Sequence, residues 1–153
     1  MIIAALFAAA LGGAPVNPCD AVTRGEVERI LGGAPVALTA DELGEETAPS
    51  CHWADASRRN RIDLSIWSAQ ELPVVGMTDA AAYFAKLKAE DGGAGELYGV
   101  GDSAFDSWRL TASGQAEGSV VVLKGDRLFV FAFLGSLLVV DAHAFVARVI
   151  ARS

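Results

Sequence analysis

The sequence is poor in the residues on which common metal and redox sites depend. It contains two histidines, His52 and His143, and two cysteines, Cys19 and Cys51. A structural zinc site needs four convergent ligands, and a redox pair usually has the spacing Cys-x-x-Cys. His52 and Asp55 are three residues apart, so on a strand they would face opposite sides of a sheet. We therefore expect no metal site and no cofactor.

Common catalytic motifs are also absent. The sequence has no Gly-x-Ser-x-Gly element, which positions the nucleophile of many hydrolases. No Lys-Ser/Thr follows the glycine-rich stretch 95–101, although a phosphate-binding loop requires it. Asp102 follows this stretch directly and is expected to cap a tight turn rather than to act as a catalytic acid. We nominate no catalytic residue and expect that the chain is not an enzyme.

Positive charge is scarce as well. The chain has 12 Lys and Arg against 19 Asp and Glu, a formal net charge of -7, and its one dense basic cluster is Arg58, Arg59 and Arg61. Binding to nucleic acid phosphates needs a larger basic patch, so we expect no nucleic acid partner and interpret the cluster as a solvated turn. The 52% hydrophobic content excludes a disordered chain, and 153 residues predict a single domain.

The apolar run at residues 2–11 is too short to span a bilayer, which takes about 20 residues. It is typical of the core of a signal peptide, so we predict a signal peptide over 1–14 and a single domain over 15–153. A buried N-terminal helix is the alternative, and no basic residue precedes the run. Pro18 before Cys19 argues against a lipid anchor. The prediction is a periplasmic or secreted protein without a stable transmembrane span.

Export has a consequence for the cysteines. In an oxidising compartment, an even number of cysteines favours a disulfide, here between Cys19 and Cys51. A redox pair or a metal site is the competing interpretation, but the spacing and the shortage of other ligands favour neither. Closing a loop of about 33 residues would stabilise the fold by roughly 3 to 4 kcal/mol.

The pattern of apolar residues predicts an α+β fold, in which an antiparallel sheet carries a short N-terminal, a middle and a C-terminal helix. Thr23 and Glu26 form a capping box at the start of the first helix. Thr78 is the expected cap of the middle helix, and Leu138 is expected to face inward from the last one. The expected helices are 24–31, 79–90 and 137–152, and the expected strands are 36–39, 50–56, 61–68, 97–100, 104–110, 119–123 and 127–134.

Three tryptophans and one acid are the candidates for a binding surface. Trp67 follows the alternation of Ile62, Leu64 and Ile66 and therefore points to the opposite side of that strand. If no helix covers that side, its ring is exposed and marks a binding patch; packing under a helix is the alternative. The candidate surface residues are Trp53, Trp67, Trp108 and Asp102.

Several short motifs occur in a recognisable order. They are Pro18-Cys19-Asp20-Ala21-Val22-Thr23, Glu26-Val27, Leu31-Gly32, Ser50-Cys51-His52-Trp53 and Gly99-Val100-Gly101-Asp102-Ser103-Ala104-Phe105. In this order the chain resembles a family of small secreted bacterial domains of unknown function, typified by actinobacterial lipoproteins. The resemblance implies a disulfide between the two cysteines and a compact α+β fold, but no known activity. Pro18 departs from the pattern of the lipoprotein members.

The sequence therefore favours a non-catalytic binding or protein-interaction module. We expect a monomer whose partner is an envelope protein or a small molecule. The alternative is an envelope enzyme, or an enzyme inhibitor, that acts through the loop around residues 99–107.

Overall fold

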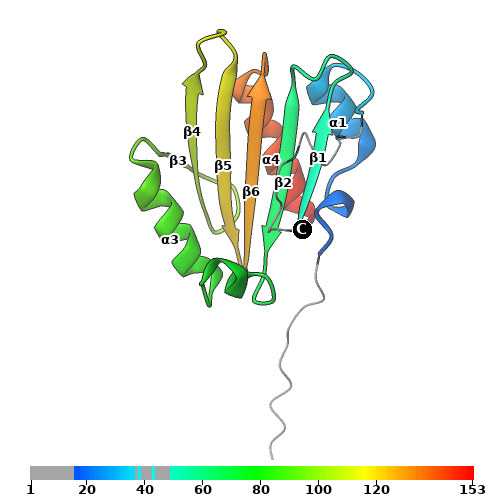
Figure 1. Ribbon diagram of the computed structural model, residues 1–153. Coiled ribbons are helices and arrows are strands. Elements are labelled where there is room, and N and C mark those ends of the chain that lie inside the picture. Colours follow the sequence, from blue (N-terminus) through cyan, green and yellow to red (C-terminus); the bar gives the residue numbers. More distant parts are fainter. Residues whose placement is uncertain (1–15, 37, 39–42, 44–48) are drawn as a thin grey trace, which may run out of the picture.

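The computed structural model describes residues 16–36, 38, 43 and 49–153. It confirms the α+β fold (Figure 1). The predicted signal peptide and most of the acidic segment 37–48 lie outside the described residues. The elements are η1 (Pro18–Asp20), α1 (Arg24–Leu31), β1 (Ser50–Ala54), β2 (Arg61–Trp67), η2 (Leu72–Val75), α3 (Ala80–Asp91), β3 (Gly95–Leu97), β4 (Ser103–Leu110), β5 (Ala116–Lys124), β6 (Arg127–Gly135) and α4 (Val139–Arg152).

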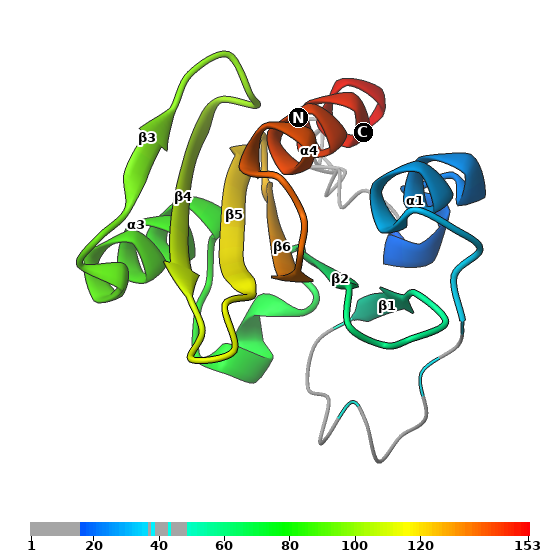
Figure 2. The same cartoon turned by 90° about the horizontal axis from the view of Figure 1, so that it is seen from above.

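One six-stranded sheet with the order β1-β2-β6-β5-β4-β3 organises the fold. Every neighbouring pair is antiparallel, and four of the pairs, β1–β2, β3–β4, β4–β5 and β5–β6, are hairpins. The last hairpin turns at Gly125 and Asp126, because Lys124 pairs with Arg127. The two faces of this sheet differ in what covers them (Figure 2).

The α4 face is the side of the sheet against which α1 and α4 pack. Alternate residues of β2, β5 and β6 point to this side, and all of them are apolar and buried in the centre of the sheet. The aromatic contacts join strand and helix: the rings of Phe131 and Phe133 each meet Phe145 of α4 edge to face, with centroids 6.2 Å apart. The buried strand residues on this side are Ile62, Leu64, Ile66, Val120, Val122, Phe129, Phe131 and Phe133.

An ion pair fastens α1 to α4. Glu26 closes the predicted capping box with Thr23, and its carboxylate also accepts hydrogen bonds from Arg152 at 2.6 and 2.7 Å. Burial by itself raises the pKa of Glu26, but the bonds from Arg152 and Thr23 outweigh it and lower the pKa to about 2. The Glu26 carboxylate is therefore charged at all ordinary pH values.

The α3 face is the opposite side of the sheet, and α3 covers only part of it. Trp67, Phe105, Val121 and Leu128 are buried there against Tyr83, Phe84 and Leu87 of the helix. In Figure 1, where α4 lies behind the sheet, no helix stands in front of the upper ends of β2, β4, β5 and β6. The strand β6 is therefore covered on both sides only in its first half, up to Val130.

Three local predictions were wrong. Asp79, not Thr78, caps α3, and its side chain accepts a hydrogen bond from the amide of Ala82 at 2.7 Å. Leu138 precedes α4 as its N-terminal cap and is 63% exposed, because the helix begins at Val139. The strand predicted at 97–100 is instead β3, Gly95–Leu97, because residues 98–102 turn before β4.

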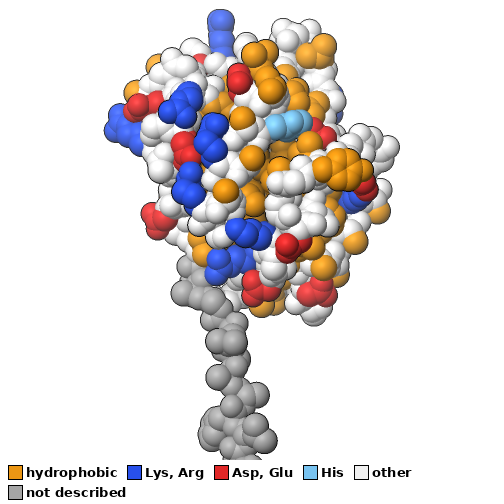
Figure 3. Space-filling view, turned by 180° about the vertical axis from the view of Figure 1, so that it is seen from behind, with side chains coloured by type: hydrophobic (Ala, Val, Ile, Leu, Met, Phe, Trp, Pro, Cys, Tyr) orange, Lys and Arg blue, Asp and Glu red, His pale blue; other side chains and the backbone are white. Residues whose placement is uncertain are grey.

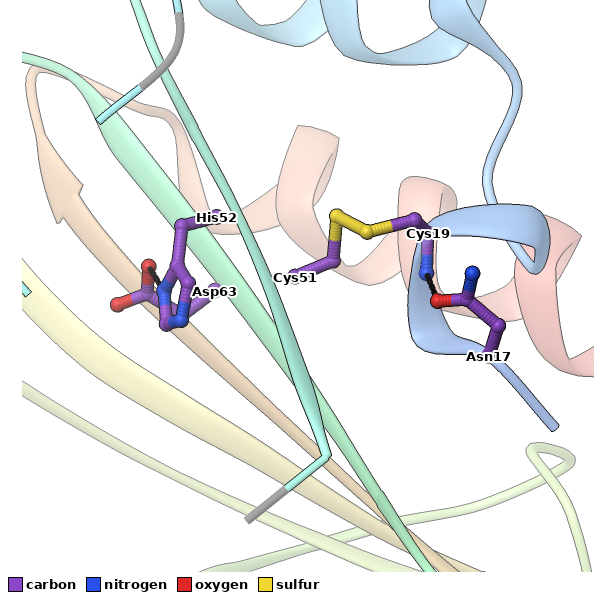
Figure 4. Close-up of a disulfide and its surroundings, with 5 residues drawn as sticks. All are labelled: Asn17, Cys19, Cys51, His52 and Asp63. Carbon is purple, nitrogen blue, oxygen red and sulfur yellow. Dashed lines mark hydrogen bonds and ion pairs between the residues drawn. A yellow bond between two sulfur atoms is a disulfide. The ribbon is translucent and has the colours of Figure 1, made fainter. Parts of the chain in front are cut away.

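The disulfide between Cys19 and Cys51 is present. It joins η1 to β1 with a Cα–Cα distance of 5.1 Å, within the usual range. Figure 4 shows it on one side of β1 and the side chains of His52 and Asp63 on the other. The disulfide thus belongs to the α4 face, where it ties the N-terminal segment to the edge of the sheet. Within the described residues no helix is long and apolar enough to cross a membrane.

Candidate functional site

A groove of about 480 Å³ lies on the part of the α3 face that α3 leaves uncovered. We call this area, formed by the upper ends of β2, β4, β5 and β6, the open half. Its floor is made of small side chains, and its margins are charged. The lining residues are Arg61, Asp63, Ser107, Arg109, Glu117, Gly118, Ser119, Ala132, Phe133 and Leu134.

The strand registers explain why these residues meet. Arg61 pairs with Leu134, Leu134 with Glu117, and Glu117 with Arg109, so one row crosses four strands. The next row on the same face runs from Asp63 through Ala132 and Ser119 to Ser107. Because side chains alternate along each strand, both rows point away from α4. The groove therefore forms where the small residues Ser107, Ser119 and Ala132 lie beside longer side chains.

Two ion pairs mark the margins of the groove. Glu117 accepts hydrogen bonds from Nε and Nη2 of Arg109 at 3.0 and 2.8 Å. On the opposite margin, Asp63 accepts from Nε of Arg61 at 2.7 Å and contacts Nδ1 of His52 at 2.6 Å. Both margins thus carry a guanidinium beside a carboxylate, which suits a ligand that offers hydrogen-bond donors as well as acceptors.

The histidine beside the groove has an acidic partner, because its Nδ1 contacts Asp63. Ser50 and Ser65 lie on the same face as His52, and their hydroxyl groups are 2.7 Å apart, so one hydroxyl donates to the other. Within the described residues no group of three or more His, Cys, Asp or Glu side chains could hold a metal ion.

The second histidine fixes α4 to the sheet. Asp106 on β4 accepts from Nε1 of Trp108 at 2.7 Å, and the same oxygen lies 2.7 Å from Nε2 of His143. The indole packs over Gly118, where a Cβ would come within 2.1 Å of its ring atoms. Figure 3 shows hydrophobic side chains gathered on this side of the molecule. We interpret this cluster as packing between β4 and α4.

The structure does not bring the four predicted surface residues together. Trp67 is 6% exposed and meets Tyr83 of α3 edge to face, so the packing alternative holds for it. Trp53 and Trp108 are both half-buried on the α4 face, but they lie far apart, on β1 at one edge of the sheet and on β4 near the other edge. Asp102 accepts a hydrogen bond from the amide of Gly125, in the β5–β6 turn, at 2.6 Å.

The loop around residues 99–107 borders a smaller hollow of about 230 Å³. Tyr98, 85% exposed, donates from its hydroxyl group to Glu96 at 2.9 Å beside this hollow. The bond that the Tyr98 hydroxyl donates to Glu96 is the main cause that raises the pKa of Tyr98. The hollow is lined by Phe84 and Lys88 of α3 and by residues 96–104.

Arg58 and Arg59, two of the three arginines of the basic cluster, lie in the β1–β2 turn, as predicted. The carboxylate of Asp55 accepts from the backbone amides of Arg59 and Asn60 at 3.0 and 3.3 Å, so it organises the turn. Burial opposes the charge of Asp55, but the bonds from Asn60 and Ser57 prevail and lower its pKa. Arg61, predicted as part of the same solvated turn, instead lies on β2 and lines the groove.

The missed residues had a signal in the sequence. Arg109 and Ser107 alternate with apolar residues in β4, and Glu117 and Ser119 do so in β5. That alternation indicates a half-exposed sheet. No family model, no curated protein and no solved structure matches the chain.

Proposed function

We propose that this chain is an exported binding module without catalytic activity, periplasmic or secreted, and that the groove of the open half is its ligand surface. The observation that carries the proposal is the groove itself: a hollow of about 480 Å³ with a floor of Ser107, Ser119 and Ala132 between two ion pairs. Ligand sites are concave and commonly enclose 300 to 1,000 Å³.

Export is supported by the disulfide. Disulfides persist in oxidising compartments and are rare in the cytosol. The resemblance to small secreted domains and the apolar run at 2–11 point in the same direction. A signal peptide over 1–14 and the absence of a lipid anchor at Cys19 are part of this proposal. Cys19 is bonded to Cys51, so its sulfur is not available to a lipid while that bond exists.

The contacts of the groove residues favour a role in ligand binding over a role in stabilising the fold. The Arg109–Glu117 pair joins neighbouring strands that already share a complete register, and its side chains are 75% and 42% exposed. An exposed pair of this kind contributes about 0 to 1 kcal/mol to folding. The fold therefore gains little from these charges, whereas a ligand that covers them would gain strong hydrogen bonds.

Site-specific cross-linking tests the proposal. A photoreactive benzoylphenylalanine replaces Ser119 in the groove in one variant and Ala147, exposed on α4, in a control variant. Both are expressed with their native leader and irradiated in intact cells. We expect a discrete adduct from position 119 and none from position 147, with the adduct mapped by mass spectrometry. Equal labelling from both positions, or none from 119, would contradict the proposal.

A further inference from the structure

The outer edge of β4 is only partly paired. β5 pairs with β4 along its whole length, from Ser103 to Leu110, but β3 pairs only with Ala104–Asp106. Among the described residues, no strand lies beside the outer edge from Ser107 to Leu110. Figure 1 shows this upper end of β4 extending beyond β3. It is the strand that forms one wall of the groove.

The hydrogen bonding of the β4–β5 turn shows which backbone groups face outward. The amide of Thr111 donates to the carbonyl oxygen of Gln115 at 2.8 Å, so these two residues form a hydrogen-bonded pair. In an antiparallel ladder such pairs alternate with pairs that direct their N–H and C=O groups to the other side. Trp108 and Leu110 therefore direct theirs away from β5. The backbone groups of Asp106 also point away from β5, and Asp106 pairs with Gly95 of β3.

The side chains on either side of this edge differ in polarity. Trp108 and Leu110 point to the α4 face, where the indole stacks on Phe133 and Leu110 is 77% exposed. The first turn of α4 adds the exposed Val139 and Val140 at the same end of that face. Arg109, between them, points to the α3 face and the groove. An added strand would thus meet apolar side chains on one face and the guanidinium of the Arg109–Glu117 ion pair on the other.

We propose that the ligand of this module includes an extended peptide segment that adds to the free edge of β4 with the pattern apolar–acidic–apolar. Strand addition satisfies the outward backbone groups of Trp108 and Leu110 and places alternate side chains on alternate faces. The acidic residue lies opposite Arg109 at the margin of the groove. This inference rests on the proposed function, because it names the ligand class for the same surface.

A second copy of this chain fits the edge less well. In a twofold dimer that uses both Trp108 and Leu110, Trp108 of one copy pairs with Leu110 of the other. Arg109 of one copy then lies directly opposite Arg109 of the other. Like charges in directly opposed positions are destabilising. Pairing Trp108 with itself would set Leu110 against Asp106, whose edge is already taken by β3. The edge therefore suits a segment of another protein.

Titration with a synthetic heptapeptide tests the inference. The probe is the blocked sequence Thr-Thr-Val-Glu-Val-Thr-Thr, added to the isotope-labelled full chain and followed by amide chemical shifts. We expect saturable shifts at Trp108 and Leu110. N-methylation of the two valines removes the amides that face β4 and should weaken binding at least tenfold. N-methylation of the glutamate removes an amide that faces solvent and should change the affinity by less than twofold.

Three results would overturn the inference. The first is no binding of the unmodified peptide. The second is equal weakening by the two methylation patterns, since side chains and not the edge would then hold the peptide. The third is a dimer in sedimentation that Leu110→Pro dissociates and Leu110→Ala does not, which would assign the edge to a second copy. In any of these cases, an adduct from position 119 would leave the proposed function intact.

Discussion

The two faces of this sheet, built from the same strands, differ in how far they are covered and in the polarity of their side chains. On the α4 face, two helices and a disulfide enclose a core in which the central strands contribute only apolar residues. On the α3 face, one helix encloses the lower half, and the upper half turns to small and charged residues. We therefore expect the residues of the α4 face to contribute most of the stability. The residues of the open half of the α3 face should contribute little to stability and be available to bind a ligand.

Truncating a large side chain on each face should give the widest contrast. Phe131 is fully buried between Phe133 and Phe145, so Phe131→Ala should lower the free energy of unfolding by about 3 to 5 kcal/mol. Leu134 is half-buried at the groove, and Leu134→Ala should cost about 1 kcal/mol. Urea denaturation measures both. Equal losses would show that the open half is as integral to the core as the α4 face.

Removing the disulfide should weaken the α4 face at its margin. The bond closes 32 residues of chain, so replacing both cysteines with serine should cost about 3 to 4 kcal/mol. Reduction of the native protein should produce a similar loss, measured by thermal unfolding with and without reductant. If neither change lowers the stability, the packing of η1 against β1 does not depend on the disulfide.

The ion pair between α1 and α4 should make stability depend on pH. The pKa of Glu26 falls from 4.5 to about 2 on folding, so its contribution is complete above about pH 5 and is lost as the pH falls toward 2. At pH 7, Glu26→Gln should cost about 2 to 3 kcal/mol, and the difference from wild type should shrink on acidification. The matched control is Glu28→Gln on the same helix, whose partner Arg24 is exposed.

The smallest expected effect belongs to the charges of the groove. Arg109→Ala breaks only the exposed pair with Glu117 and should change the free energy of unfolding by less than about 1 kcal/mol. Chemical denaturation at low and high salt would measure the change. A loss above 2 kcal/mol would assign the pair a structural role and remove the contrast between the faces.

The sequence predicted the covered parts of the fold better than the open ones. The capping box of Thr23 and Glu26 located α1, and the alternation of Ile62, Leu64 and Ile66 located β2, because both patterns are local. The groove was missed because it depends on registers between β2, β6, β5 and β4, which join Arg61 to Arg109 across the sheet. The tryptophans were poor predictors of a binding surface, since large aromatic rings occur in cores as often as on surfaces.

One measurement tests the contrast most directly. A groove variant combines Ser107→Ala, Arg109→Gln, Glu117→Gln and Ser119→Ala, all on the open half. Its free energy of unfolding in urea is compared with that of the wild type. We predict a value within about 1 kcal/mol of wild type, because half-buried or exposed polar side chains at an open groove contribute little to folding. A loss of 3 kcal/mol or more would show that the polar residues of the groove hold the sheet together, and would contradict the assignment of the open half to binding.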